Sequence, residues 1–315
     1  MSHKISFIIS ARNELQSIVD ATIFQLLETT SDYEKEILLI DDGSDVPLER
    51  PSPEVMLLRN KQAMGIGGSR RYGASIASGD VLAWLDAHLT FGMGWLDQMM
   101  AHVDSGALLC SASWDYYLTR PYCWGADLFW QATRDYRNRR SPGFRWRHRI
   151  RNPGHGAVDV GMVIGACYMM DRKSYNQIGG LSPLFINYGA GDIDLSIRAW
   201  MAGLGVKCVT GAKVGHLYRT SFPYRVKWEH IEFNQLVMVR TIFEERTVGG
   251  LERYFEPVPE QVNAWFEEVD WKGWRDVVQS HRRISDEEFF ETVEIPTGIF
   301  SVKDEVAVRT PPLAR

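Results

Sequence analysis

The chain has 315 residues, of which 45% are hydrophobic, so it has ample material for one large α/β domain or two smaller ones. It carries 35 basic and 40 acidic residues and a formal net charge of −5. Because there is no excess of basic residues, a nucleic-acid partner is disfavoured. No run of 18 or more apolar residues occurs, and we therefore expect no transmembrane span.

The N-terminus and the cysteines indicate the cellular compartment of the protein. The first residues run directly into a short apolar segment, without the long apolar region and cleavage site of a signal peptide. The four cysteines form no pairing or zinc-binding motif, and Cys110, Cys167 and Cys208 occur in apolar runs typical of strands. We expect buried thiols in a reducing environment, and hence a cytoplasmic protein.

The first third of the chain alternates short apolar runs with amphipathic segments, the pattern of βαβ units on a mostly parallel sheet. The apolar runs predict strands at residues 5–10, 36–40, 55–58 and 81–85. Helical spacing of apolar residues predicts helices at residues 15–27 and 67–77. The fold class is therefore α/β.

Polar and glycine-rich segments follow these strands. Asp41 and Asp42 end the second strand, where a carboxylate could accept hydrogen bonds from a base or a ribose, or could simply form a turn. Residues 65–71 are rich in glycine, open a helix and include Arg70 and Arg71. Such a loop can bring backbone N–H groups and a guanidinium to phosphates. Its sequence matches neither a P-loop nor a dinucleotide fingerprint.

The apolar strand at residues 81–85 is followed at once by Asp86 and His88. Two positions apart, they project to the same side, toward the crevice where open α/β sheets bind ligands. Carboxylate and imidazole suit Mn²⁺ or Zn²⁺, and completion by phosphate oxygens favours Mn²⁺. The alternative is a helix cap and a turn.

Composition changes after residue 112, and basic residues are dense between Arg134 and Arg151, interleaved with aromatic residues. Three interpretations stay open for this stretch. It is a solvated face, a mobile loop that grips a phosphorylated or acidic acceptor, or a membrane-surface contact.

Strand character resumes at residues 163–170, and a short helix follows at 172–178. A glycine-rich turn then leads into a helix, with Asp192 at or near its N-cap and Asp194 in its first turn, where capping alone would explain both. The last strand is expected at 206–209. Beyond residue 222 the chain is helical and charged, without a catalytic constellation, and the tail from Pro296 is expected to be loosely attached.

Four short motifs occur in an order that resembles GT-A-fold glycosyltransferases of family 2: residues 10–14, 41–44, 85–88 and 191–194. The chain is most similar to the catalytic domain of polypeptide N-acetylgalactosaminyltransferases. This likeness rests on Leu-Asp-Ala-His at 85–88 with Gly-Trp-Leu at 94–96, on Met-Asp-Arg at 170–172 with Ile-Gly at 178–179, and on Val-Gly-His at 214–216 with Arg219. The resemblance covers residues 4–220, and it does not include the lectin domain of that family.

The resemblance implies a set of site residues. Asp86, His88 and His216 would hold Mn²⁺, with Mg²⁺ as the alternative, against the diphosphate of a UDP-sugar. The residues implied to border the uracil, ribose and phosphates are Ser10, Arg12, Asp42, Gly65, Arg70 and Asp86. Gly165 and Ala166 would lie beside the sugar or the acceptor.

One departure from the family affects the stereochemistry. Where the polypeptide transferases have Trp-Gly-Gly-Glu-Asn, this chain has Tyr-Gly-Ala-Gly-Asp at residues 188–192, with Gly191 in place of the acid. Inverting family 2 enzymes commonly place their general base at the position of Asp192. The resemblance thus combines the metal site of a retaining enzyme with the base position of an inverting one.

We therefore predict a metal-dependent transfer of a sugar from a UDP-sugar to a hydroxyl acceptor, inverting, with Asp192 as general base. The alternatives are a retaining enzyme like the polypeptide transferases, a non-catalytic nucleotide-sugar-binding protein, and a nucleotidyltransferase. The acceptor would be a glycan, a peptide or a small molecule.

The predicted organisation is a GT-A catalytic domain at residues 1–220 and a helical C-terminal extension at 221–315. The catalytic domain divides into a nucleotide-sugar half at 1–112 and an acceptor half at 113–220. A homodimer through the C-terminal helices is a further prediction.

Overall fold

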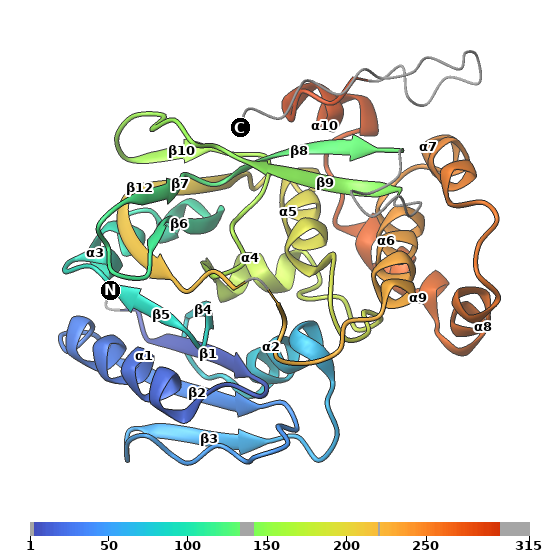
Figure 1. Ribbon diagram of the computed structural model, residues 1–315. Coiled ribbons are helices and arrows are strands. Elements are labelled where there is room, and N and C mark those ends of the chain that lie inside the picture. Colours follow the sequence, from blue (N-terminus) through green and yellow to red (C-terminus); the bar gives the residue numbers. More distant parts are fainter. Residues whose placement is uncertain (1–2, 133–141, 220, 297–315) are drawn as a thin grey trace.

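The structure is a computed structural model that describes residues 3–132, 142–219 and 221–296 (Figure 1). Its centre is a mixed sheet in the order β10-β12-β6-β11-β4-β1-β2-β3, with β5 paired to β12 and β7 paired to β6. The strands of this sheet are β1 (Ile5–Ala11), β2 (Lys35–Asp41), β3 (Val55–Arg59), β4 (Val81–Asp86), β5 (Leu89–Phe91), β6 (Leu108–Asp115), β7 (Pro121–Cys123), β10 (Ala157–Asp159), β11 (Cys167–Asp171) and β12 (Val206–His216). A separate hairpin pairs β8 (Ala126–Gln131) with β9 (Gly143–His148).

The first half of the sheet is parallel, as the alternating pattern predicts. Strands β1, β2, β3 and β4 pair in parallel register. Alternate residues of β1 enter different cores: Phe7 packs with Val19 of α1 (Gln16–Thr29), and Ile8 packs with Ala74 of α2 (Gly65–Ile76). Because the strand side chains alternate, the two helices cover opposite faces. The α/β class and the helical C-terminal part are confirmed.

The second half of the sheet is mixed. Strand β11 is antiparallel to both β4 and β6, whereas β6 and β12 are parallel. The strand predicted at 163–170 begins only at Cys167. The Ala166 carbonyl still accepts from the Asp86 N–H, which extends the pairing with β4 by one bond, but the Gly165 carbonyl accepts from the Arg70 side chain instead of a neighbouring strand. The strand predicted at 206–209 instead continues through a bulge to His216.

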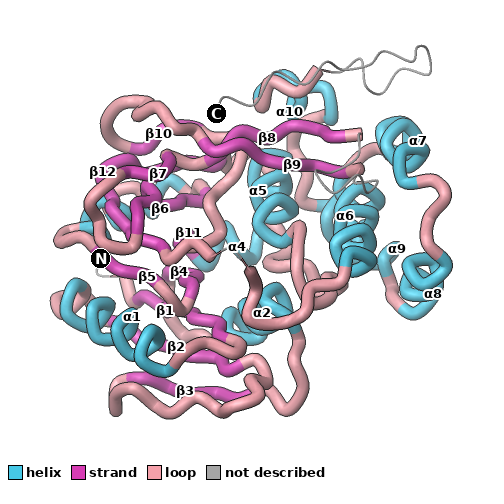
Figure 2. Tube along the Cα trace, viewed as in Figure 1, coloured by secondary structure: helices cyan, strands magenta, loops and turns pink. Residues whose placement is uncertain are grey.

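The remaining helices are α3 (Trp95–Met100), η1 (Val103–Ser105), α4 (Arg172–Gln177), α5 (Gly191–Met201), α6 (Trp228–Ile242), α7 (Glu245–Glu252), η2 (Arg253–Phe255), α8 (Glu260–Glu268), α9 (Trp271–Ser280) and α10 (Asp286–Thr292). Helices α6, α7, α8 and α9 gather beside the sheet, on the right in Figure 2. Within the described residues, no helix is both long and apolar enough to cross a membrane.

The basic stretch between Arg134 and Arg151 lies partly outside the described residues, which resume at residue 142. Its second half is not the loop considered from sequence: Gly143–His148 forms β9 and pairs with β8. The tail from residue 297 onward also lies outside the described residues, so the expectation for it stays a prediction.

Candidate functional site

The end of β4 and the end of β12 bring three potential metal ligands together. Asp86 is the last residue of β4, and His88 follows it immediately before β5. Strand β5 pairs antiparallel with β12, which sets His216 opposite Leu89. Ligand atoms of Asp86, His88 and His216 all lie within 4.8 Å of one another. A residue from far along the chain thus joins the Asp-x-His pair.

Two of the three distances within this cluster match those between ligands of one metal ion, and the third is longer. The two Nε2 atoms of His88 and His216 are 3.2 Å apart, and Nε2 of His216 lies 3.3 Å from Oδ2 of Asp86. Nε2 of His88 lies 4.0 Å from the same oxygen. Ligands about 2.1 Å from a shared ion are separated by roughly 3 to 3.5 Å at the usual angles. The donor set, one carboxylate and two imidazoles, suits Mn²⁺ or Zn²⁺.

Arg70 is a buried cation that links the cluster to Asp192. It is 3% exposed, and its guanidinium donates to Asp86 at 2.8 Å, to Asp192 at 3.2 Å and to the Gly165 carbonyl at 2.8 Å. Burial alone would raise the pKa of Asp86, but the hydrogen bond with His216 and the charge of Arg70 lower it to about 2. Asp86 is therefore ionised, as a metal ligand must be.

Asp192 lies in the first turn of α5 but caps nothing. The N-cap residue is Ala190 at φ 65°, and no side chain makes a capping hydrogen bond. Asp194 is also no cap, because it forms a buried ion pair with Arg198. The capping interpretation of both carboxylates is therefore wrong. One third of the Asp192 side chain is exposed, and burial raises its pKa although Arg70 opposes this.

Glu14 and Arg219 support the cluster, and sequence reasoning gave neither of them a role. Oε1 of Glu14 lies 3.3 Å from Nδ1 of His88, and the Arg219 guanidinium donates to the same carboxylate at 2.8 Å. The Glu14 side chain is 6% exposed. Burial would raise the pKa of Glu14, but His88 and Arg219 together lower it. Both residues lie within motifs that carry the family resemblance. Their place in these motifs was the one sign in the sequence of a role at the site.

Asp42 and Gly65 organise the start of α2. Asp42 is 3% exposed and accepts hydrogen bonds from the backbone N–H groups of Met64 and Gly65 at 2.7 and 2.8 Å and from Asn60 at 2.8 Å. Gly65 has φ +79°, and a Cβ there would lie 2.1 Å from the Asn187 carbonyl oxygen. These contacts give both residues a structural task, and their contact with a nucleotide stays a prediction.

Ser10 and Arg12 lie at the end of β1. The Ser10 hydroxyl and the Arg12 Nε are buried without a hydrogen-bond partner among the described residues. The Arg12 guanidinium lies over the Tyr224 ring, 5.0 Å from its centroid. Burial and the charge of Asp86 raise the pKa of Tyr224 to about 12, so this phenol stays protonated near the cluster.

Aromatic side chains extend outward from His216. The Tyr218 ring contacts the His216 ring at 4.4 Å and stacks on Tyr122 at 4.0 Å. Tyr122 contacts His148, which contacts Trp146 at 4.7 Å. Tyr122, Trp146 and Tyr218 are 40–45% exposed. This row, which sequence reasoning did not find, is called the aromatic surface below.

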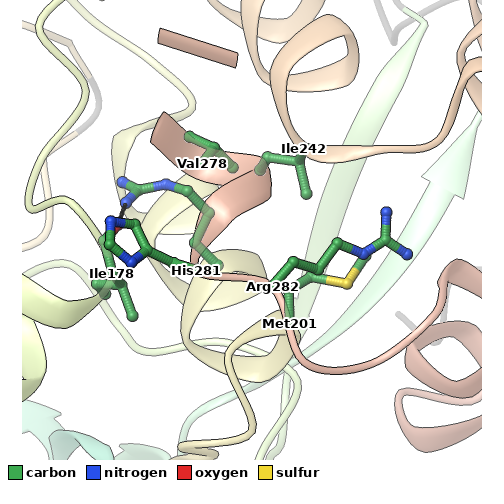
Figure 3. A pocket seen from close by; sticks show the side chains of 7 residues that line it. Ile178, Met201, Ile242, Val278, His281 and Arg282 are labelled. Carbon is green, nitrogen blue, oxygen red and sulfur yellow. Dashed lines mark hydrogen bonds between the residues drawn. The ribbon is translucent and has the colours of Figure 1, made fainter. Parts of the chain in front are cut away.

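A small pocket elsewhere in the helical part is lined by Ile178, Arg198, Met201, Ile242, Val278, His281 and Arg282 (Figure 3). Its two arginines are already paired, Arg198 with Asp194 and Arg282 with Asp286. The pocket does not include any residue of the Asp86 cluster, and we assign it no function.

Three features together define a glycosyltransferase of the GT-A fold. They are the order of the sheet, the carboxylate and histidines at the strand ends, and the glycine-rich start of α2. Residues 6–179 match the family described as Glycosyl transferase family 2, and the chain belongs to this family. Residues 148–221 also match the N-terminal domain of galactosyltransferase.

Curated relatives agree with this assignment. The chain is 28% identical to polypeptide N-acetylgalactosaminyltransferase 5 of Caenorhabditis elegans over 71% of its length, and 27% identical to polypeptide N-acetylgalactosaminyltransferase 11 of Xenopus tropicalis over 84%. It covers 38% and 46% of these two proteins, so it spans less than half of their length. The resemblance drawn from the motifs is confirmed.

A solved structure shares the fold. The crystal structure of GalNAc-T7 with UDP, GalNAc and Mn²⁺ superimposes with a TM-score of 0.75 at 20% identity, over 93% of this chain and 57% of the other. This similarity confirms the GT-A fold of the chain, including part of the C-terminal helical region.

Proposed function

We propose that the chain is a metal-dependent glycosyltransferase that moves a sugar from a UDP-sugar to a hydroxyl acceptor. The observation that carries the proposal is the cluster of Asp86, His88 and His216 at the ligand-binding end of a family 2 sheet. The donor and the metal are supported by the GalNAc-T7 structure, which was determined with UDP, GalNAc and Mn²⁺.

In this proposal Asp86, His88 and His216 hold Mn²⁺. The ion would supply Lewis-acid stabilisation of the charge that develops on the departing UDP. Arg70 would fix the carboxylate of Asp86, and Glu14 would orient the His88 ring. We propose further that Ser10, Arg12 and Asp42 border the uracil and ribose of the nucleotide, with Gly65 and Arg70 nearer its phosphates.

We propose retention of the anomeric configuration. The resemblance to polypeptide N-acetylgalactosaminyltransferases supports this alternative, because their metal site is that of retaining enzymes. The inverting reaction with Asp192 as base is not confirmed. One oxygen of Asp192 accepts from Arg70, and the other faces Gly165, where a Cβ would lie 2.1 Å away. The hydrogen bond and positive charge of Arg70 make the Asp192 carboxylate a weaker proton acceptor.

For the acceptor we propose a polypeptide hydroxyl, which the names of the relatives support. The aromatic surface offers exposed rings beside His216 for such a chain to pack on. The four cysteines are free and buried, as expected. The cytoplasmic location stays a prediction, as does a homodimer.

The test is a donor screen followed by product analysis. Protein with Mn²⁺ and a serine- and threonine-containing peptide is offered a panel of UDP-sugars, and the anomeric configuration of any product is read by NMR. We expect release of UDP and a product with the configuration of the donor. An Asp192→Asn variant should then keep that configuration and lose only part of the rate, because no proton transfer to Asp192 is required.

Other outcomes of this screen contradict the proposal. An inverted product together with an inactive Asp192→Asn variant would restore the inverting mechanism. Release of UMP or pyrophosphate would indicate a nucleotidyltransferase. Binding of a UDP-sugar without hydrolysis or transfer to any acceptor would indicate a binding protein.

A further inference from the structure

Helix α6, which lies beyond the family 2 match at residues 6–179, contacts the loop that enters the site. This loop, residues 186–190, leads directly into the first turn of α5, where Asp192 meets Arg70. The contact is polar as well as apolar, and its centre is the side chain of Asn234. Asn234 is 1% exposed, so its amide must find its partners within the protein.

All the hydrogen bonds of the Asn234 amide go to backbone groups of the loop. Its Oδ1 accepts from the Ile186 N–H at 3.0 Å. Its Nδ2 donates to the carbonyl oxygens of Ile186 at 3.0 Å, Tyr188 at 3.3 Å and Gly189 at 3.0 Å. One buried amide therefore fixes both ends of a four-residue turn whose backbone pairs elsewhere only at Asn187, in an isolated bridge with Gly65, among the described residues.

Two neighbours of Asn234 reinforce the contact. Nδ1 of His230 lies 3.0 Å from Nδ2 of Asn187. Gly189 adopts φ +107°, and a Cβ there would lie 3.1 Å from the Ile231 side chain. From the other side, the N–H of Ile66 in α2 donates to the Asn187 carbonyl at 3.1 Å. The loop is thus held between α6 and the start of α2.

The held loop leads directly into the turn of α5 that carries Asp192. Tyr188 lies close enough to Asp192 and Asp86 for their charges to add to the effect of burial in raising its pKa. Asp192, two residues beyond the loop, shares Arg70 with Asp86. A shift of the loop would therefore move Tyr188 and Asp192 relative to the cluster without touching Asp86, His88 or His216.

We propose that Asn234 is a positioning residue for sugar transfer: it fixes residues 186–189 so that Asp192, just beyond them, keeps its place beside Arg70. The C-terminal helical part thereby completes the site instead of only packing beside it. This inference rests on the proposed function. A misplacement of about 1 Å can lower a rate on the order of a hundredfold, so a side chain that only holds backbone can have a large effect on turnover.

The test compares Asn234→Ala with Gln235→Ala. Gln235 is the adjacent residue of α6, is 2% exposed, and makes the same kind of paired contact with a different segment, the backbone of Phe144 in β9, at 3.0 and 3.1 Å. For each variant we would measure UDP-sugar hydrolysis in water, Mn²⁺ affinity by calorimetry, and hydrogen exchange of residues 186–190. Hydrolysis needs no acceptor, so an effect of Gln235→Ala on acceptor binding through β9 would not change the measured rate.

We expect Asn234→Ala to lower kcat for hydrolysis by about tenfold or more, to leave Mn²⁺ affinity within about twofold, and to speed exchange in the loop. Gln235→Ala should lose a similar amount of thermal stability while keeping kcat and loop exchange near those of the wild type. If Asn234→Ala does not fold, Asn234→Ser, which puts a shorter hydroxyl in place of the amide, replaces it.

Wild-type kcat in the Asn234 variant, or loop exchange no faster than in the Gln235 variant, would overturn the proposal. A parallel loss of Mn²⁺ affinity would also overturn it, because the defect would then be global. Absence of both hydrolysis and transfer to any acceptor in the wild type would contradict the proposed function instead, and loop exchange would still decide whether Asn234 holds the loop.

Discussion

At the scale of single residues, the site depends on side chains that hold other side chains. Arg70 binds the carboxylate of Asp86, and the carboxylate of Glu14 contacts both His88 and Arg219. Such partners fix the orientation of metal ligands and keep them in the ionisation state that metal binding needs. The geometry of the cluster is therefore set by residues that would not themselves touch the metal.

Glu14→Gln tests this support directly. The amide removes the negative charge beside His88 and weakens the contact with Arg219, so Mn²⁺ affinity should fall roughly 10- to 100-fold, the usual effect of losing such a partner. Calorimetric titration with Mn²⁺ measures the change. Glu54→Gln, which alters an exposed acid just before β3, is the matched control. Equal affinity in both variants would show that Glu14 does not support the cluster.

The sequence predicted the three clustered residues better than the side chains that support them. Asp86 and His88 are two positions apart after an apolar strand, a local pattern with a chemical meaning, and the family motif added His216. Glu14 contacts Arg219 across 205 positions, and no local pattern indicates a pair of that kind. Asp42 was predicted at the nucleotide, but its observed partners are the backbone of α2 and Asn60.

At the scale of elements, α5 depends on a buried ion pair instead of a cap. Asp194 and Arg198 are at most 2% exposed in their side chains, and Arg198 also donates to the Ile178 carbonyl. Burial raises the pKa of Asp194, although the charge and hydrogen bonds of Arg198 oppose this. The pair connects α5 to the end of α4 and so fixes the helix that carries Asp192.

Asp194→Asn should therefore be costly. It leaves the Arg198 charge buried without its partner, and breaking such a pair destabilises a protein by about 3–5 kcal/mol. Urea unfolding measures the loss. The double variant Asp194→Asn with Arg198→Met removes the stranded charge and should recover part of the stability. A loss of less than about 1 kcal/mol in the single variant would contradict this assignment, because that is the value of an exposed pair.

Elements with strong periodicity were predicted well, and those defined by their partners were not. The βαβ pattern gave β1, β2, β3 and β4 to within a few residues. The hairpin of β8 and β9 was missed because β9 carries arginines and each strand carries an exposed aromatic residue, which suggest a loop. Residues 163–166 are apolar enough for a strand, but the Gly165 carbonyl bonds to the Arg70 side chain instead of a neighbouring strand.

At the scale of the whole molecule, the helical C-terminal part shares a core with the catalytic fold. Phe144 of β9 and Ile197 of α5 belong to the same buried cluster as Phe233 and Leu236 of α6. The boundary predicted near residue 220 stays a prediction, and we propose that the two parts fold together. This shared core is also what brings Asn234 to the loop before α5.

The central claim is that the cluster binds UDP through a metal ion. The most direct measurement is the melting temperature of the wild type and of His216→Ala with UDP, in Mn²⁺ and in EDTA. We predict that UDP stabilises the wild type in Mn²⁺ by mass action and much less in EDTA, and that His216→Ala loses the metal-dependent part as fully as His88→Ala does. Equal stabilisation by UDP in Mn²⁺ and EDTA, or wild-type behaviour of both histidine variants, would contradict the account.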